Sequence, residues 1–352
     1  MTGESRRERA RVAVETLTPG YFALVMASGI ISVGMRLEEV ELLSDVLLGV
    51  CVTAFVVLLS LNVVRLAGFR TAVVEDFTDP RRAFGFFTFV AGTNVLGVRL
   101  AMDGHHTATA VLLCCSGVVW AVLGYVVPWT AVLRHRDHPV VADANGTWFI
   151  WVVASQSVAI AAATLEPVHG GARNGLALLA VTSWSVGTFL YAAAGVFVAL
   201  RLMLYPFGPE ELTPPYWVAM GAMAITVLAG ARIVEMADAP MVTATRGLVA
   251  GLSVVFWGFA TWLIPVLVAA GWWRHVRQRV PLRYEATLWS IIFPLGMYAV
   301  AGIYLGEADD LPLVERIGSV ELWVAFGAWL VVLVAMLRHV LRTVLVPATV
   351  AS

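Results

Sequence analysis

The chain has 352 residues, of which 60% are hydrophobic and 13% are charged, and its mean hydropathy is +0.83. A water-soluble domain of this composition would expose apolar patches larger than soluble proteins tolerate, so this class is excluded. The net charge of −1 identifies no partner, and we expect the protein to contact the lipid bilayer and no nucleic acid.

Ten stretches are long and apolar enough to cross a membrane, since one span needs about 20 mostly apolar residues. We therefore expect an all-α integral membrane protein, with a transmembrane domain at 19–345 between tails at 1–18 and 346–352. The predicted spans are 19–35, 42–66, 84–101, 107–133, 147–165, 175–201, 215–236, 246–273, 285–305 and 320–345.

All 23 basic residues are arginines, and their distribution between alternate loops predicts the orientation of the spans. If the N-terminus is cytoplasmic, seventeen arginines lie on the cytoplasmic side and six lie outside. The outer loops are short and acidic, as around Glu38 and Asp309. We expect a multi-pass protein of the cell (inner) membrane with both termini in the cytoplasm.

A similar segment recurs five times, at intervals of about 65 residues, with aromatic residues near its start and small residues after them. A longer run rich in Val and Leu follows each copy. This pattern predicts five helical hairpins around a membrane pore. The copies begin at Thr18, Arg82, Gly146, Pro214 and Glu285.

The odd-numbered helices are rich in Gly, Ala, Ser and Thr, which let helix backbones approach closely, so we expect them to form an inner ring. The even-numbered helices are long and aliphatic, as suits contact with lipid. Residues that interrupt helices fall at comparable depths in the ring, which favours kinks around an aqueous path, although Gly and Pro also serve packing alone. They are Gly29, Gly92, Ser155 to Ser157, Gly221, Pro294 and Gly296.

Two motifs resemble the tellurite-resistance/dicarboxylate transporter family, which includes the plant guard-cell slow anion channels and their bacterial homologues. TPGYFALVMASGIIS, from Thr18 to Ser32, is similar to the first helix of that family. LWSIIFPLGMY, from Leu288 to Tyr298, is similar to its ninth helix. The pattern of ten spans in five hairpins matches over nearly the whole chain.

The resemblance implies a quasi-five-fold arrangement of hairpins around a central pore in each protomer, usually assembled as a homotrimer. It also implies that an aromatic side chain of the ninth helix blocks the pore. The matching residue is Phe293, directly before Pro294, and a Phe packed between helices is the alternative. Because the family also contains carriers for malate-type dicarboxylates and sulfite, membership leaves channel and carrier both open.

Polar side chains of the odd helices are the candidates for the pore lining, because weak dipoles replace part of an anion's hydration without trapping it. Hydrogen bonding between helices is the alternative for each of them. The candidates are Ser28, Ser32, Thr93, Asn94, Ser155, Gln156, Ser157, Thr226 and Ser290.

Charged residues are expected only at the two ends of the odd helices. Arg36, Arg99 and Arg232 follow the first, third and seventh helices; Arg99 and Arg232 are candidates for an outer vestibule that attracts anions, or they only complement helix dipoles. At the inner mouth five helix N-termini favour anions, and nearby arginines add to the potential or only enforce topology. Those arginines are Arg81, Arg82 and Arg283.

The middles of the odd helices carry no ionisable side chain on which a coupled proton would reside, which favours passive conduction of small anions. The alternative is a secondary carrier for malate-type dicarboxylate or sulfite, with or without coupling to protons. No phosphate loop, catalytic triad or redox motif is visible, so we expect no enzyme and no cofactor. We expect no metal site either, since the loop histidines lack further ligands. These are His105, His106, His135 and His138.

Overall fold

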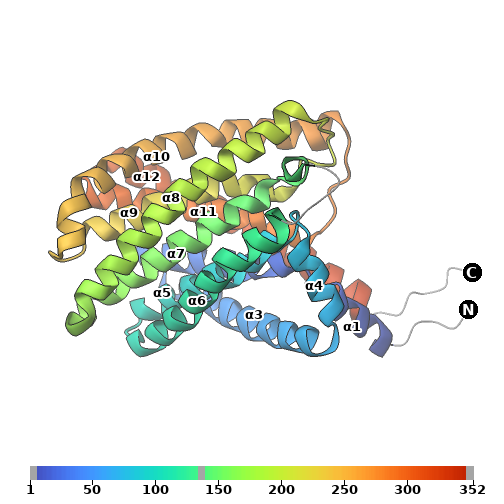
Figure 1. Cartoon of the computed structure of the whole chain (residues 1–352), viewed down its shortest axis with the longest axis horizontal. Helices are drawn as coiled ribbons and strands as arrows, with labels where there is room; N and C mark the ends of the chain where they lie inside the picture. The colour runs from blue at the N-terminus through green and yellow to red at the C-terminus, as the bar shows by residue number, and fades with distance from the viewer. Residues whose placement is uncertain (1–5, 134–138, 346–352) are drawn as a thin grey trace, which may run out of the picture.

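A computed structural model describes residues 6–133 and 139–345, and ten long helices with no β-strand make up most of this part of the chain (Figure 1). Each coincides with one predicted span, which confirms the all-α membrane fold. The five from odd-numbered spans are α2 (Ala23–Leu37), α5 (Phe87–Met102), α7 (Phe149–Leu165), α9 (Val218–Val234) and α11 (Trp289–Ala308). Those from even-numbered spans are α3 (Glu41–Gly68), α6 (His106–Val127), α8 (Arg173–Leu204), α10 (Pro240–Trp272) and α12 (Pro312–Val340).

Burial separates the two sets of helices as their composition predicted. In the most apolar window of each odd-span helix, 78% to 89% of the residues are buried, against 17% to 28% in the even-span helices. We call α2, α5, α7, α9 and α11 the inner helices and the other five the outer helices. The outer helices place their Val and Leu side chains where lipid surrounds the protein.

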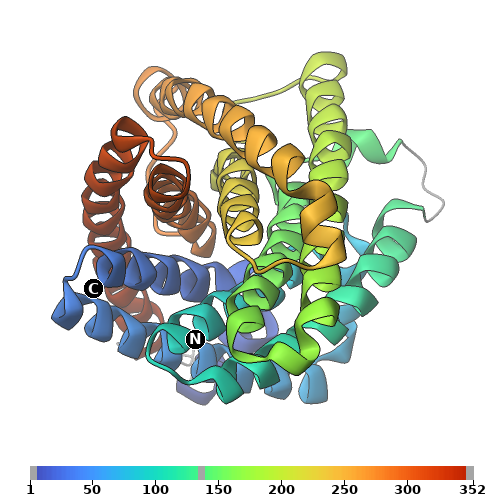
Figure 2. The ribbon, with the colours of Figure 1, turned by 90° about the vertical axis from the view of Figure 1, so that its left-hand side faces the viewer.

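The inner helices contact one another in a closed ring. Contacts run from α2 to α5, α5 to α7, α7 to α9, α9 to α11, and α11 back to α2. Figure 2 looks at the bundle from the end where the inner helices finish, with outer helices around the inner ones. The closed ring supports the quasi-five-fold arrangement, which stays a prediction.

A short 3₁₀ helix precedes each inner helix, and the five of them also contact one another in a closed ring, here called the collar. Two of its contacts need glycine. A Cβ on Gly146 would lie 2.3 Å from the backbone of Pro215, and one on Gly85 would lie 3.0 Å from Gly20 N. The collar therefore draws the N-terminal ends of the inner helices together. It comprises Pro19–Phe22, Ala83–Phe86, Gly146–Trp148, Pro214–Trp217 and Ala286–Leu288.

Two shorter helices, α1 (Arg6–Glu15) and α4 (Arg70–Thr78), were not predicted. A buried ionic cluster holds them against α3. Arg65 Nη2 lies 2.7 Å from Asp76 Oδ2 of α4, and Arg65 Nε donates to the carbonyl of Glu15. α1 also contacts the π-helical turn Leu341–Leu345 after α12, so both described ends of the chain lie at the collar end of the bundle (Figure 1).

The two helices of the last hairpin approach each other closely at three glycines. Gly302 and Gly306 of α11 and Gly318 of α12 bring the two backbones together. A Cβ on Gly318 would lie 2.6 Å from the carbonyl oxygen of Ala299 and 2.8 Å from Ile303 N, and backbone atoms cannot yield as side chains do.

We expect Gly318→Ala to destabilise the protein by about 1 to 3 kcal/mol, because the added methyl group forces α11 and α12 apart. The matched control is Gly327→Ala on the same helix, where no atom lies within 4 Å of the added carbon. Thermal unfolding of the detergent-purified protein, followed by tryptophan fluorescence, measures both. Equal midpoints for the two variants would contradict a role for this close approach.

Candidate anion pore

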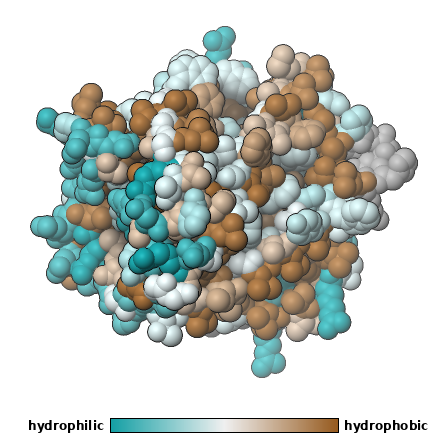
Figure 3. Space-filling model, turned by 60° about the vertical axis from the view of Figure 1, so that its left-hand side comes forward, coloured by the Kyte–Doolittle hydropathy of each residue, from teal (hydrophilic) through white to brown (hydrophobic). Residues whose placement is uncertain are grey.

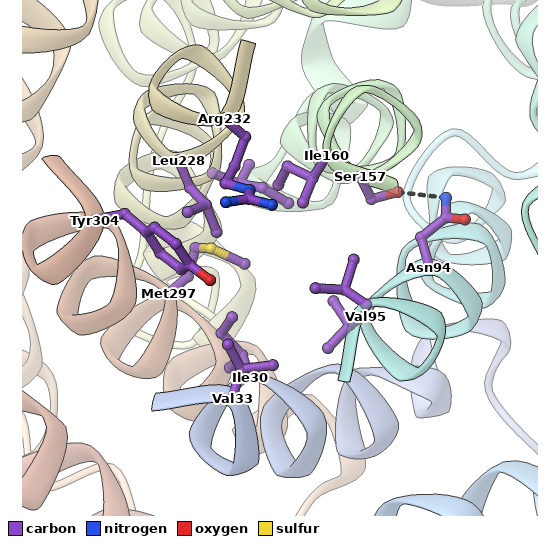
Figure 4. Close-up of a pocket in the computed structure, with 12 residues that line it drawn as sticks. Ile30, Val33, Asn94, Val95, Ser157, Ile160, Leu228, Arg232, Met297 and Tyr304 are labelled. Carbon is purple, nitrogen blue, oxygen red and sulfur yellow. Dashed lines mark hydrogen bonds between the residues drawn. The ribbon is translucent and has the colours of Figure 1, made fainter. Parts of the chain in front are cut away.

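All five inner helices contribute to one cavity, which lies nearer the end where these helices finish. Its volume is about 20 Å³, space for about one water molecule. Figure 4 shows side chains from every inner helix around this opening. The lining residues are Ile30, Val33, Asn94, Val95, Val98, Ser157, Ile160, Ile225, Leu228, Arg232, Met297 and Tyr304.

Two of the polar candidates, Asn94 and Ser157, line the cavity and hydrogen bond to each other (Figure 4). Asn94 Nδ2 donates to Ser157 Oγ at 3.0 Å, and the Ser116 hydroxyl of α6 donates to Asn94 Oδ1 at 2.7 Å. Ser157 donates in turn to the carbonyl of Ala154. Ser116 thereby fixes the amide of Asn94, which keeps a second N–H to donate.

Arg232 is the one charged residue among those that line the cavity in the described structure. Its Nη1 lies 2.7 Å from Glu235 Oε2, and its guanidinium carbon lies 5.3 Å from the centroid of the Tyr304 ring. The side chain is 24% exposed. Near the end of α9 its charge also complements the helix dipole, and its role in an outer vestibule stays a prediction.

Phe293 and Pro294 lie on α11, on the collar side of the cavity. Phe293 is 1% exposed and precedes Met297, a lining residue, by four positions, so the two side chains share one face of the helix. Pro294 has no N–H to donate to the carbonyl of Ser290, another candidate, which is buried one turn earlier. A Cβ on Gly221 would lie 2.8 Å from Pro294 Cγ, so glycine permits α9 to approach α11 here.

Ser28, Ser155 and Thr226 take part in hydrogen bonds between helices. The indole N–H of Trp329 donates to Ser28 Oγ at 3.0 Å, and that of Trp120 donates to Ser155 Oγ at 3.0 Å. The indole of Trp184 donates to the Thr226 carbonyl at 3.1 Å. Each indole belongs to an outer helix. None of the three candidates is among the residues that line the cavity. Ser28 and Ser155 bond to another helix through their side chains, whereas the Thr226 hydroxyl donates to the carbonyl of Ala222 within α9.

Thr93 and Gln156 also lie outside the cavity lining. The Thr93 hydroxyl donates to the carbonyl of Phe89 within α5. Gln156 is fully buried, and its Nε2 donates to the carbonyl of Trp184 on α8 at 3.1 Å. A Cβ on Gly187 would lie 2.5 Å from that nitrogen, so this glycine makes room for the amide between α7 and α8.

Arg99 does not line an outer vestibule, which corrects the sequence expectation. Its side chain is fully buried, and Nε donates to Ser32 Oγ at 2.9 Å and to Ser44 Oγ at 3.0 Å. Nη1 and Nη2 pair with Asp103 at 2.6 Å and Asp45 at 3.0 Å. Arg99 and Ser32 therefore join α2, α3 and α5. A buried guanidinium is tolerated because all three nitrogens are paired.

Two arginines expected at the inner mouth take part in ion pairs. Arg81 Nε lies 3.0 Å from Asp143 Oδ1, and Arg82 Nε lies 3.0 Å from Asp76 Oδ1. These pairs diminish the positive potential that both arginines contribute.

Arg283 lies at the same end of the bundle, near the collar, where it lines a separate cavity of about 170 Å³ with Tyr216 and Leu288. The neighbouring Tyr284 hydroxyl lies 2.8 Å from the hydroxyl of Tyr21. Burial raises the pKa of Tyr284, so this contact is made by neutral hydroxyl groups.

The described residues contain no group of three or more side chains suited to holding a metal ion. His105 precedes α6 and His106 is its first residue, at the end opposite the collar, and His135 and His138 lie outside the described residues. The loops after the inner helices carry several carboxylates, such as Glu38 and Asp309, and hydrophilic residues gather over this end (Figure 3).

Met297 and Tyr304 were not among the sequence candidates, although a signal for them exists. They follow Phe293 by four and eleven residues, a spacing that places all three on one helix face. Apolar lining residues such as Ile30 and Val95 carry no comparable signal, because every inner helix is rich in similar side chains.

We expect Arg99→Ala to destabilise the protein by about 2 to 3 kcal/mol, since hydrogen bonds to charged groups contribute about 1.5 to 3 kcal/mol and several are lost together. The control is Arg36→Ala, which removes a side chain that is 30% exposed and pairs with Glu41 and Asp103 at 3.3 and 3.7 Å. Thermal unfolding in detergent compares them. If Arg99→Ala lowers the unfolding midpoint no more than Arg36→Ala does, the buried cluster adds no stability.

Comparison with known proteins gives a match to the model of the voltage-dependent anion channel family over residues 16–337. An uncharacterised membrane protein of Mycobacterium tuberculosis is 65% identical over 156 residues, which is 44% of this chain and 79% of that protein. Two uncharacterised transporters of Methanocaldococcus jannaschii are 25% and 23% identical over 91% and 93% of this chain, and 92% and 96% of their own lengths.

The family match begins just before the collar and ends in the last outer helix, so it covers the whole inner ring and the cavity. It confirms the resemblance carried by the first and ninth spans. The chain therefore belongs to the voltage-dependent anion channel family.

Proposed function

We propose that the protein conducts small anions passively through the ring of inner helices, with the Phe293 side chain as the gate. The observation that carries the proposal is the cavity enclosed by all five inner helices, with Arg232 as its one charged lining residue in the described structure. A cation beside otherwise weakly polar walls favours anions over cations without holding them tightly.

The location of Phe293 supports a gate. The ring belongs to the same helix face as Met297, on the collar side of the cavity, and it is almost fully buried. A hydrophobic constriction at this depth stops ions because it is too narrow and too dry for their hydration shells. Pro294 weakens the hydrogen bonding of α11 at this turn, which eases the small movement that a gate needs.

Passive flow is favoured over proton coupling by the chemistry of the cavity. No Asp, Glu or His is among its lining residues in the described structure. The buried carboxylate of Glu166, after α7, lies outside this lining and pairs with Arg173 Nε at 2.7 Å. We also propose a homotrimer, on the family resemblance, and cytoplasmic termini, on the distribution of arginines between alternate loops.

Flux into liposomes tests the proposal and separates it from a carrier. With purified protein we expect chloride and nitrate flux that follows the electrical gradient and does not change when a pH gradient is imposed. Saturable malate uptake driven by a pH gradient would instead establish the carrier.

We expect Phe293→Ala to raise anion flux by about tenfold or more, which corresponds to lowering the barrier by about 1.4 kcal/mol. The control is Phe149→Ala on α7. Phe149 is also buried, but its ring packs 5.1 Å from that of Tyr191 on α8, away from the cavity lining. Voltage clamp or liposome flux measures both variants. Unchanged flux in well-folded Phe293→Ala protein, or an equal rise in both variants, would rule out the gate.

A further inference from the structure

The guanidinium of Arg232 is only partly satisfied by the protein. Nη1 pairs with Glu235, while Nε and Nη2 have no hydrogen-bond partner among the described residues. The Tyr304 ring lies on one face of the group. Figure 4 shows the guanidinium directed into the opening between the inner helices. Two nitrogen donors of a cation are therefore available on the side where an anion would pass.

Glu235 is placed to leave this pair at low cost. It follows α9 by one residue, and its side chain is 38% exposed, so its carboxylate gains water when it moves away. Ion pairs with this exposure contribute only about 0.2 to 1 kcal/mol. An anion from solution that reaches Arg232 thus competes with a carboxylate that is always nearby but weakly held.

We propose that Arg232 is the binding site for the permeating anion and that Glu235 is a tethered competitor for it. The carboxylate occupies the guanidinium when no anion is bound, and an arriving anion displaces it. This proposal rests on the proposed function. The exchange keeps the site near electrical neutrality in both states, so the anion binds weakly enough to leave, as conduction requires.

The site takes one small monovalent inorganic anion, such as a halide or nitrate. The cavity is small, about 20 Å³, so a halide or nitrate requires less widening of the ring than a four-carbon dicarboxylate does. A dianion would also need a second cation, because unpaired charge is costly to place among apolar walls. Arg232 is the only cationic side chain in the described lining. The amide of Asn94 adds one N–H that it can still donate to an anion.

The competition is tested by measuring chloride flux from liposomes at a series of chloride concentrations. The variants compared are Glu235→Gln, Arg232→Gln and the double variant. For Glu235→Gln we expect the half-saturating concentration to fall by about fivefold, the upper limit for a pair of this exposure. For Arg232→Gln we expect it to rise. In the double variant, removal of Glu235 should have no further effect, because the group for which it competes is gone.

The matched control is Asp238→Asn, which removes an acidic charge at the same end of the bundle. Asp238 is 83% exposed and pairs with Arg246 at 3.0 Å instead of Arg232. If Asp238→Asn lowers the half-saturating chloride concentration as much as Glu235→Gln does, the effect is one of general surface charge and the proposal is overturned. A shift by Glu235→Gln in the Arg232→Gln background would also overturn it.

Thermal stabilisation of detergent-purified protein by chloride measures binding without flux. We expect chloride to stabilise the wild type, to stabilise Glu235→Gln more strongly, and to leave Arg232→Gln unchanged. Malate at equal ionic strength should have no effect. If wild-type liposomes show no anion flux, the proposed function fails while this pattern still supports the site. Equal stabilisation of all variants by chloride would overturn the proposal that Arg232 binds the anion. Stabilisation by malate as strong as that by chloride would overturn the proposal that the site takes only a small monovalent anion.

Discussion

The structure depends on hydrogen bonds that connect each outer helix to the inner helix of the next hairpin. Ser44 of α3 accepts from Arg99 of α5, Trp120 of α6 donates to Ser155 of α7, and Trp184 of α8 donates to the Thr226 carbonyl of α9. The hydroxyls of Thr261 in α10 and Tyr298 in α11 lie 2.7 Å apart, and Trp329 of α12 donates to Ser28 of α2. The last contact joins the fifth hairpin to the first, so these bonds complete a circuit. Within a bilayer no hydrophobic force selects one helix neighbour over another, so such directional contacts are needed to order the hairpins.

This use of polar groups also shapes the cavity. Ser28, Ser32 and Ser155 are bonded to outer helices, and the hydroxyls of Thr93 and Thr226 donate within their own helices, so none of these five side chains lines the cavity. The walls are consequently mostly apolar, with Asn94, Ser157 and Tyr304 as neutral polar groups and Arg232 as the one charge in the described lining. Fixed partners, such as Ser116 for Asn94, hold the few donors that line the cavity in place. The same bonds that assemble the ring therefore determine which donors remain for an anion.

The sequence predicted the spans well because the bilayer dictates both the length and the composition of a helix that crosses it. The division into inner and outer helices followed from small residues, which burial confirms. The directions of polar side chains were not predictable in the same way. Ser28 is bonded to a tryptophan 301 residues later, and neither residue type signals that pairing. α1 and α4 were missed since neither is apolar, and the contacts of Arg65 with Asp76 and with the Glu15 carbonyl hold them against α3.

Arg99 and Arg232 occupy similar positions in the sequence pattern but have different surroundings in the structure. Both lie near the C-terminal end of an inner helix, where a cation is favourable, and the sequence assigned them the same role. Arg99 meets two serines and two aspartates, which satisfy its charge and exclude water, so it can only hold helices together. Arg232 meets a single exposed carboxylate and an aromatic ring, which leave it partly solvated and open to exchange. The number of fixed partners around each guanidinium, rather than its position on the helix, decides whether it stabilises the fold or remains available to an ion.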